Sequence, residues 1–365
     1  MAAPQGAVAK LAWHEETTWG ESAATLRAKF AAAEGYRLYF DSCVPDLRKD
    51  PVDIPEISGV ESIDHSEFVE GQIGCSLTVS FRLRYSGLHA ALLAYALGTL
   101  TTTGAGPYNH RGDLADDLPS LGFMWGPPDT VNTVFDNWIF SGMKCARMTI
   151  AHTAGEPILV TQEWIGKTWD FDDDSSQTWP DPVTTATLGP HEPYVQWHDV
   201  DAGTLLWDAD SAAQVTMNCR SWEIQVENNI SPRFLLQDGR YGAEPARDTK
   251  REITARVTLE KNLAWEQLAE AFGITGATTS DPGDLMLDYD GPGTNEAAFF
   301  RLNNCRVTSI PPVVSGEGPL EEEVSFRAHV DASAAADLKY PIWFDIDNDE
   351  QGPAGSNPAT WQLTV

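Results

Sequence analysis

Hydrophobic and polar residues alternate most regularly in two stretches of the chain. In Ser76–Arg84 every second residue from Leu77 to Leu83 is apolar, and in Glu252–Glu260 every second residue from Ile253 to Leu259 is apolar. A period of two residues places all of these apolar side chains on one face of a strand. Each stretch therefore predicts a strand with one face on a core and the other toward water or a neighbouring subunit.

Each of these strands is followed by a short stretch with helical character that ends at a glycine. Leu93–Gly98 reads LAYALG and Leu268–Gly273 reads LAEAFG. Glycine is the usual residue just past a helix end, because it adopts the backbone conformation required there without strain. We therefore expect an amphipathic helix at His89–Leu97 and a second helix at Ala264–Phe272.

Further signals repeat in the same order downstream. Cys145–Thr149 reads CARMT and Cys305–Thr308 reads CRVT, and the turns Gly155–Pro157 and Gly316–Pro319 follow them. Strand pairs are expected at 137–150 with 158–164 and at 299–310 with 320–329. Signals that recur in one order predict an internal duplication whose sequence has diverged.

The spacing of these signals divides the chain into five parts. We expect an N-terminal arm at 1–35 with a helix at 23–33, a first unit at 36–169, an acidic linker at 170–193, a second unit at 194–330 and a tail at 331–365 that crosses to a neighbour. Residues 43–74 predict a long loop or extended hairpin, 99–134 a surface excursion and 229–249 a loop. With 29 Gly and 23 Pro the chain favours short strands over long helices, so the expected fold class is mainly β.

Composition narrows the function. A net charge of −30 argues against binding the nucleic-acid backbone, and it fits a surface that stays soluble or lets a polyanion pass without adhering. No apolar run approaches the roughly 18 residues of a membrane span, and no signal peptide is recognisable, so we expect a protein made in the cytoplasm that does not enter membranes. The five scattered cysteines form no CxxC pair and predict buried, reduced residues.

Two segments resemble a known family. Residues 68–99, FVEGQIGCSLTVSFRLRYSGLHAALLAYALGT, and Trp222–Leu259, WEIQVENNISPRFLLQDGRYGAEPARDTKREITARVTL, follow the order strand, long loop, alternating strand and short helix. With the CxRφT strand and the GExP hairpin, this order is similar to that of the tail tube protein of long-tailed bacteriophages. The resemblance covers most of residues 36–330.

The resemblance implies two tandem β-sandwich or partial-barrel domains, each with a short flanking α-helix. Such subunits form rings whose inner sheets join around a channel, and the rings stack into a tube for genomic DNA and the tape-measure protein. Because this chain carries two units, it implies homotrimeric rings with pseudo-sixfold symmetry. The implied partners are the chain itself, the tape-measure protein, the tail terminator and baseplate or tail-tip proteins, with DNA passing unbound. No catalytic residue, cofactor or metal is implied.

Two sets of residues are candidates for function in such an assembly. An acidic channel wall would repel DNA at short range, and the candidate wall acids are Glu252, Glu260, Glu321 and Glu323. The loops before the two alternating strands are candidates for contacts between stacked rings. Their charged residues are Asp46, Arg48, Asp50, Asp53, Glu56, Arg233, Asp238, Arg240, Glu244 and Arg247.

Other interpretations remain open at this point. Within the same class, the chain could be a tail terminator or baseplate ring protein; in a different class, an acidic, Trp-rich β-sandwich could bind or cleave carbohydrate. The DxDxD segments at Asp170–Asp174 and Asp345–Asp349 resemble the start of a calcium loop but lack its glycine and its bidentate glutamate. His191-Glu192 and Trp197–Asp199 lack the spacing of a metal or acid–base site. No GxSxG, GxGxxG or P-loop motif occurs.

Overall fold

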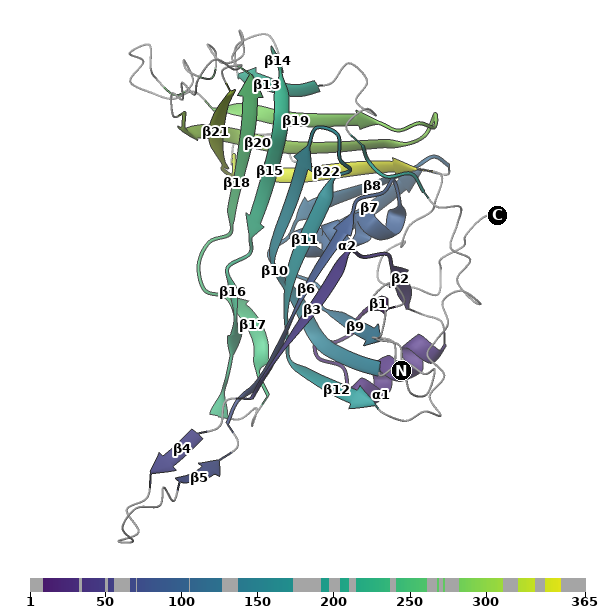
Figure 1. Ribbon diagram of the computed structural model, residues 1–365, viewed down its shortest axis with the longest axis vertical. Helices are drawn as coiled ribbons and strands as arrows, with labels where there is room; N and C mark the ends of the chain where they lie inside the picture. Colours follow the sequence, from purple (N-terminus) through teal and green to yellow (C-terminus); the bar gives the residue numbers. More distant parts are fainter. Residues whose placement is uncertain are drawn as a thin grey trace, which may run out of the picture.

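The structure is a computed structural model, and it describes residues 9–32, 35–49, 52–55, 66–69, 71–104, 106–126, 137–172, 192–196, 204–209, 215–236, 241–260, 268, 272, 282–310, 321–331 and 339–348. The described part is mainly β and antiparallel (Figure 1). The elements are β1 (Lys10–Glu15), α1 (Ala23–Ala31), β2 (Tyr36–Leu38), β3 (Ser42–Lys49), β4 (Val52–Pro55), β5 (Ser66–Val69), β6 (Ile73–Arg82), α2 (Gly87–Leu97), β7 (Gly98–Gly104), β8 (Tyr108–Leu114), β9 (Leu121–Gly126), β10 (Asn137–Thr153), β11 (Leu159–Gly166), β12 (Thr168–Asp172), β13 (Thr204–Ala209), β14 (Val215–Met217), β15 (Cys219–Glu227), β16 (Ile230–Arg233), β17 (Ala243–Arg247), β18 (Glu252–Glu260), β19 (Gly283–Asp290), β20 (Ala297–Ser309), β21 (Glu321–Ala328) and β22 (Ile342–Asn348).

One long sheet runs through both halves of the chain. Its strand order is β3–β6–β11–β10–β15–β18–β21–β20, and every neighbouring pair is antiparallel. The alternation in the sequence is confirmed, since β6 and β18 bury every second side chain. We call the opposite, solvent-facing side of this long sheet the polar face.

Two flanking sheets cover the apolar side of the long sheet. The first has the order β2–β1–β9–β10–β12, and the second β14–β13–β19–β20–β22. The long strands β10 and β20 belong to both layers, because their first halves pair in the flanking sheets and their second halves in the long sheet. A hairpin of β7 and β8 extends the second flanking sheet from β22. Among the described strands no series of pairings returns to its start, so these sheets are open and form no closed barrel.

The two halves share their order of pairing down to their irregularities. In β10 a bulge at Gly142 shifts the register against β9, and in β20 a bulge at Asn304 shifts it against β19; both residues have positive φ, 67° and 48°. A second bulge follows four residues later in each strand, between Cys145 and Arg147 and between Val307 and Ser309. These bulges make β10 equivalent to β20 and, through the pairings, β3, β6 and β11 equivalent to β15, β18 and β21.

The sequence echo of the cysteines is out of step with this equivalence. When the bulge at Gly142 is aligned with the bulge at Asn304, Cys145 is equivalent to Val307, and Met143 is equivalent to Cys305. All four side chains are buried. One buried apolar residue can replace another of similar size in a core. The cysteines therefore do not identify equivalent positions of the two halves, whereas the backbone bulges do.

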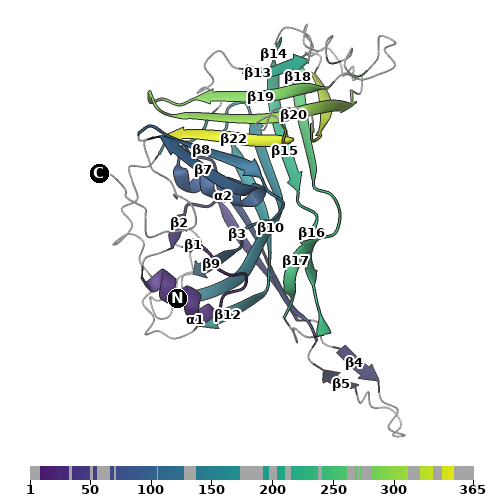
Figure 2. The ribbon, with the colours of Figure 1, turned by 180° about the vertical axis from the view of Figure 1, so that it is seen from behind.

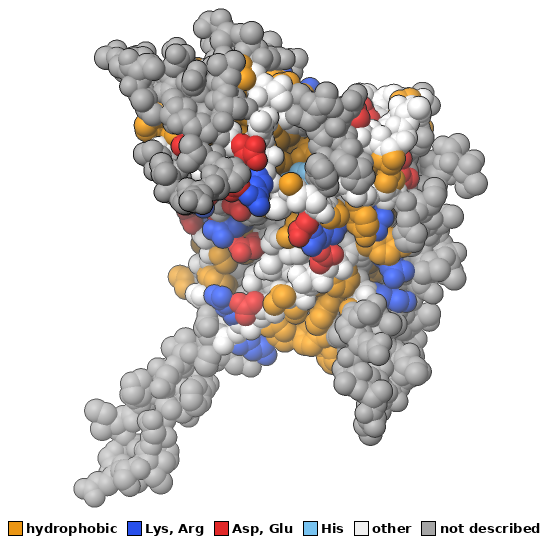
Figure 3. All heavy atoms as spheres, turned by 45° about the horizontal axis from the view of Figure 1, so that its top comes forward, with side chains coloured by type: hydrophobic (Ala, Val, Ile, Leu, Met, Phe, Trp, Pro, Cys, Tyr) orange, Lys and Arg blue, Asp and Glu red, His pale blue; other side chains and the backbone are white. Residues whose placement is uncertain are grey.

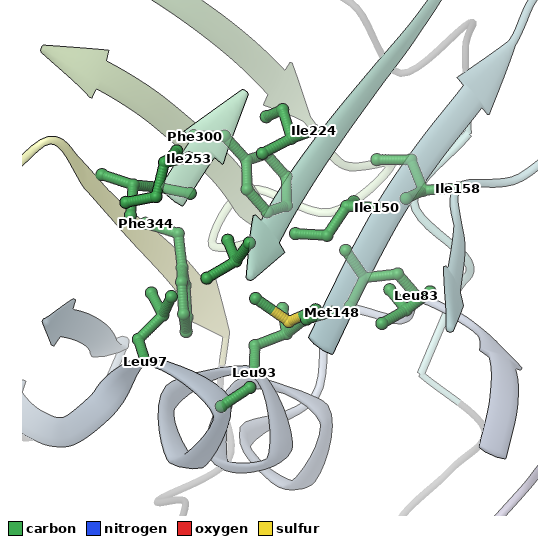
Figure 4. Packing of buried hydrophobic residues seen from close by; sticks show 14 of the residues in the cluster. Leu83, Leu93, Leu97, Met148, Ile150, Ile158, Ile224, Ile253, Phe300 and Phe344 are labelled. Carbon is green, nitrogen blue, oxygen red and sulfur yellow. The ribbon is translucent and has the colours of Figure 1, made fainter. Parts of the chain in front are cut away.

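The halves meet edge to edge in one seam. Strand β10, the last strand of the long sheet in the first half, pairs with β15, the first strand of the second half, from Arg147–Glu227 to Thr153–Ser221. The hydrophobic core continues through this seam, and residues of both halves gather over helix α2 in Figure 4. There Leu93 of α2 lies near Met148 of the first half, and Leu97 lies near Phe344 of the second.

Helix α2 is confirmed in its position but not in its character. It begins after the cap Ser86, whose hydroxyl accepts a hydrogen bond from the Leu88 N–H, and it ends at Gly98 as expected. The expectation of an amphipathic helix is wrong, because all its residues except Leu88 are buried. The β7–β8 hairpin packs on α2 (Figure 2), and of the helix residues Leu88 alone stays partly exposed. Of the second expected helix, Leu268 and Phe272 are described, and both are helical.

Several expectations for loops and ends differ from the structure. Residues 99–134, expected as a surface excursion, contain the strands β7, β8 and β9, and β9 is almost wholly buried. Residues 10–15, placed in the N-terminal arm, form β1 in the first flanking sheet, while helix α1 confirms the helix expected within that arm. Residues 342–348 of the tail pair within their own chain as β22. Of the segment expected as a long loop or extended hairpin, the described residues make an extended hairpin of β3 and β6.

Burial sets the protonation state of His89 in α2. Its Nδ1 accepts a hydrogen bond from the Arg84 N–H at 3.1 Å, and burial, with the positive charge of Arg84, lowers the pKa of His89 to about 3. The unfolded imidazole has a pKa near 6.5. Between the folded and the unfolded pKa, the imidazole is protonated in the unfolded chain and neutral in the folded chain. The free energy of unfolding therefore decreases as the pH falls below 6.5.

We therefore expect acidification to cost the wild-type protein more than a His89→Gln variant. From pH 7 to pH 5 the free energy of unfolding should fall by about 2 kcal/mol more in the wild type, since each pH unit contributes about 1.4 kcal/mol. Urea unfolding of both proteins at both pH values measures the difference. Equal pH dependence of the two proteins would show that His89 is protonated in the folded state.

Candidate functional site

The four candidate wall acids lie together on the polar face. Glu252 and Glu260 are on β18, and Glu321 and Glu323 are on the adjacent β21, each pointing away from the buried side chains of its strand. Glu260 stands directly opposite Glu321, and Glu323 opposite Thr258. The four acids therefore lie on one face of adjacent strands, and their position in a channel stays a prediction.

Arginines, which the sequence analysis did not single out, alternate with acids on this face. Arg147 on β10 stands directly between Glu163 on β11 and Glu227 on β15. Its Nε donates a hydrogen bond to Glu227, and its guanidinium lies 3.9 Å from the Glu163 carboxylate. The pattern of alternating polar residues in the two hairpins was the signal for these contacts, but the strand register that joins them is not visible in one sequence.

The row continues across the next two strands. Glu227 stands opposite Glu252 on β18, and Glu252 forms a 3.2 Å ion pair with Arg327 on β21. We call the row across five strands the ion-pair belt; it consists of Glu163, Arg147, Glu227, Glu252 and Arg327. Figure 3 shows acidic and basic side chains next to one another on the surface.

Other arginines of the long sheet are also paired with acids. Arg82 on β6 binds Asp41 at 2.8 Å, and Arg220 at the start of β15 binds Glu321. On β3, Arg48 binds Asp46 at 2.8 Å. The surface is therefore mixed in sign, which refines the expectation of a simply acidic wall.

A second group of residues fastens the seam between the halves. Asn228, fully buried after β15, donates hydrogen bonds from Nδ2 to the carbonyl oxygens of Ala96 at 2.9 Å and Cys145 at 2.8 Å. Arg251, before β18, donates to the carbonyl oxygens of Leu97 and Ala115 at 3.0 and 2.9 Å. The last carbonyls of a helix lack partners inside the helix, so the second half caps α2 of the first half.

The two long hairpins that extend from the sheet contain the candidate stacking residues (Figure 1). Of these, Glu244 on β17 binds the buried Lys144 of β10, and Arg247 donates to the Asp116 carbonyl at 3.0 Å. These two side chains therefore hold the hairpin against its own body, beside a cleft of about 300 Å³. Asp46 and Arg48 lie on β3, Asp53 on β4 and Arg233 on β16, while Asp50, Glu56, Asp238 and Arg240 lie outside the described residues.

Strand β3 forms an open edge of the long sheet within the described part of the chain. Its inward side chains Cys43 and Leu47 are only half-buried, whereas their equivalents on β15, Trp222 and Val226, are buried. Val44 on the polar face is 59% exposed. The difference arises because β15 has β10 beside it and β3 has no second neighbour among the described strands.

The alternative chemical sites gain no support from the described residues. No group of three potential metal ligands occurs among them. Asp170 pairs with Arg27 at 3.0 Å, Asp345 and Asp347 lie on β22, and Asp174 and Asp349 are outside the described residues, as are His191, Trp197 and His198. Burial raises the pKa of the Cys43, Cys75 and Cys219 thiols to about 12, and also raises that of Cys145 and Cys305. All five thiols are free, and the elevated pKa values make them poor nucleophiles.

Comparison with protein families shows to which family the chain belongs. A model of the phage tail tube protein family matches residues 6–328. The chain belongs to the phage tail tube protein family. As a tail tube protein it has a structural role in the virion tail, where such proteins assemble into a tube with other tail proteins. A search of curated proteins finds no match. Neither α1 nor α2, the helices that the structure describes, is long and apolar enough to cross a membrane.

Proposed function

We propose that this tail tube protein forms rings of three protomers, which stack into the channel through which genomic DNA and the tape-measure protein pass. The main support for this proposal is the antiparallel pairing of β10 with β15 at the seam. This seam joins two equivalent strand sets edge to edge and leaves β3 with an open edge. A head-to-tail contact of the same kind between chains places the β20 edge of one protomer against β3 of the next, and three such contacts close a ring.

The same equivalence supports two tandem units in the chain. The first unit runs from β1 to β12 and the second from β13 to β22, so the arm and tail expected from the sequence contribute one strand each to their own unit. The linker expected at 170–193 begins within β12, whose last residue is Asp172. Residues 194–196 bridge to Arg84, just after β6, and to Pro157, just before β11. Three chains of two units give a pseudo-sixfold ring.

The polar face lines the channel in this arrangement. Its candidate wall acids, Glu252, Glu260, Glu321 and Glu323, lie on one face of adjacent strands, and closing the long sheet into a ring turns that face inward while the flanking sheets face outward. The hairpins β4–β5 and β16–β17 extend from one end of the sheet, where a stacked ring sits (Figure 2). There Leu236 and Tyr241 are exposed apolar residues available for the stacking contact.

The protein carries out this role without catalysis, a cofactor or a metal, after synthesis in the host cytoplasm. Its further partners are the tail terminator and the baseplate or tail-tip proteins. A sugar-binding function is the alternative of a different class. It is disfavoured because Trp13, Trp164 and Trp207 are fully buried core residues, not an exposed row on which sugars stack.

Electron microscopy of the purified protein at high concentration tests the proposal. We expect tubes, and end-on views of rings with six similar lobes around an open channel. Single rings that do not stack favour a terminator or baseplate ring protein. Monomers that bind glycans on an array, and do not form rings, would contradict the proposal.

A further inference from the structure

We propose that the ion-pair belt acts as an arginine mask: its glutamates occupy arginines that would otherwise bind the phosphates of a passing DNA duplex. The inference rests on the proposed function, because it assigns the polar face to contact with DNA. The ion-pair belt differs from a simply acidic wall, because it contains arginines that could bind nucleic acid and pairs them with glutamates.

Both arginines of the ion-pair belt have carboxylate partners. Arg147 has a carboxylate on each side, from Glu163 and Glu227, and Glu227 also accepts a hydrogen bond from Gln225 Nε2 at 2.6 Å. Arg327 is paired with Glu252 at 3.2 Å. The side chains of Arg147 and Arg327 are 45% and 49% exposed, so a phosphate could reach both guanidinium groups if their carboxylates were absent.

Non-specific DNA binding draws its energy from cations that replace the counterions of the phosphates. A guanidinium already held by a carboxylate must give up that partner before it binds a phosphate, so the exchange gains little. The acids also outnumber the arginines in the belt, and the surplus negative charge repels the duplex at distances within the screening length of about 8–10 Å.

The remaining residues of the polar face support the same property. The positions of β6, β10, β11, β15, β18 and β21 that face away from the core hold mainly Ser, Thr, Glu and Arg, and no aromatic residue occurs at these positions. Lys144 on β10 is buried and paired with Asp117 and Glu244. Stacking on aromatic side chains is the main sequence-independent way to hold exposed bases. With no aromatic rings at these positions, with Arg147 and Arg327 paired and with Arg256 opposite Glu223, the surface offers DNA few points at which it is retained.

The test removes the mask and leaves the arginines. In the Glu163→Gln/Glu227→Gln/Glu252→Gln variant, Arg147 and Arg327 lose their charged partners. We expect the full-length variant to bind duplex DNA at least about tenfold more tightly than the wild type at 50 mM salt. Since each freed cation contributes about −0.9 to the slope of log K against log salt, the slope should be about −2. Fluorescence anisotropy of a labelled duplex at several salt concentrations measures both quantities.

Two matched variants separate masking from net charge. Asp248→Asn/Asp288→Asn/Asp290→Asn removes the same charge from three exposed residues outside the polar face, and it should bind DNA no more tightly than the wild type. Adding Arg147→Gln and Arg327→Gln to the belt variant should abolish the gained binding. Circular dichroism shows whether each variant is folded. If the triple belt variant does not fold, the Glu163→Gln/Glu227→Gln variant frees Arg147 alone. Its slope of log K against log salt should be near −1.

Three results would overturn the mask: DNA binding by the wild type of equal strength, no gain in the folded belt variant, or an equal gain in the surface control. Electron microscopy of the same preparations keeps the proposed function distinct. A gain of DNA binding in protein that never forms rings would leave the belt in place and contradict the tube, while normal rings without the gain would contradict the mask alone.

Discussion

Replacing Asn228 with alanine should lower the free energy of unfolding by about 3 kcal/mol. The side chain is fully buried and satisfies the carbonyl oxygens of Ala96 and Cys145, one at the end of α2 and one in β10. Alanine removes the Asn228 donor from both oxygens, and each such loss costs about 1–3 kcal/mol. Chemical unfolding followed by circular dichroism measures the change.

Two further variants make this expectation specific. Asn228→Asp keeps the shape but points carboxylate oxygens at two carbonyl oxygens, so it should cost more than alanine. Gln225→Ala, on the exposed side of the same strand, should change stability by less than about 0.5 kcal/mol. An Asn228→Asp variant as stable as the wild type would show that the seam does not depend on this donor.

Replacing Leu47 with lysine should prevent ring formation while the protomer remains folded. Leu47 is a half-buried, inward-facing residue of the open edge strand β3. In the isolated protomer the lysine side chain can extend past the edge into water. Once a neighbouring chain covers that edge, the ammonium loses water without gaining a partner, which costs about 3 kcal/mol or more, or about a hundredfold in affinity for each contact. Analytical ultracentrifugation measures the shift from rings to single chains.

A lysine at a different sheet edge provides the control. Leu100 on β7 is likewise partly buried, and β7 is the last described strand of the second flanking sheet. Leu100→Lys should leave rings intact, because the proposed contact involves β3 alone. Loss of rings in both variants, or in neither, would contradict the assignment of β3 to the contact between protomers.

The sequence predicted the elements whose pattern is local. The alternation in β6 and β18 identified the two central strands and their buried faces, and Gly98 marked the end of α2. The order of recurring signals also anticipated that the two halves follow the same path. In each case the information lies within about ten neighbouring residues.

Elements defined by distant contacts were missed. Strand β9 is short and lies between glycine- and proline-rich segments, and its burial depends on pairing with β10 and with β1, which lies at the start of the described chain. The burial of helix α2 depends on the β7–β8 hairpin, and the Gly- and Thr-rich sequence of β7 shows no strong apolar pattern. The repeated cysteine motif aligned Cys145 with Cys305, which is two residues off the alignment given by the bulges at Gly142 and Asn304.

The candidate surface was half predicted for the same reason. The sequence predicted that Glu252 and Glu321 lie on or beside strands, whereas their common face follows from the register of β18 with β21. The arginines that hold them, Arg327 and Arg220, come into reach only through the register between strands and a diagonal contact. Lys144 and Asn228 act across the seam, and a single sequence contains no local signal of a contact between two halves.

The number of chains in one closed ring tests the central claim most directly. Native mass spectrometry of single rings, with end-on electron micrographs of the same sample, counts both the chains and the lobes. We expect six lobes and a ring mass of about 120 kDa, three times the chain mass of 39.9 kDa. A ring of six chains, near 240 kDa, would keep the tube but contradict the equivalence of the two halves on which the proposed ring rests.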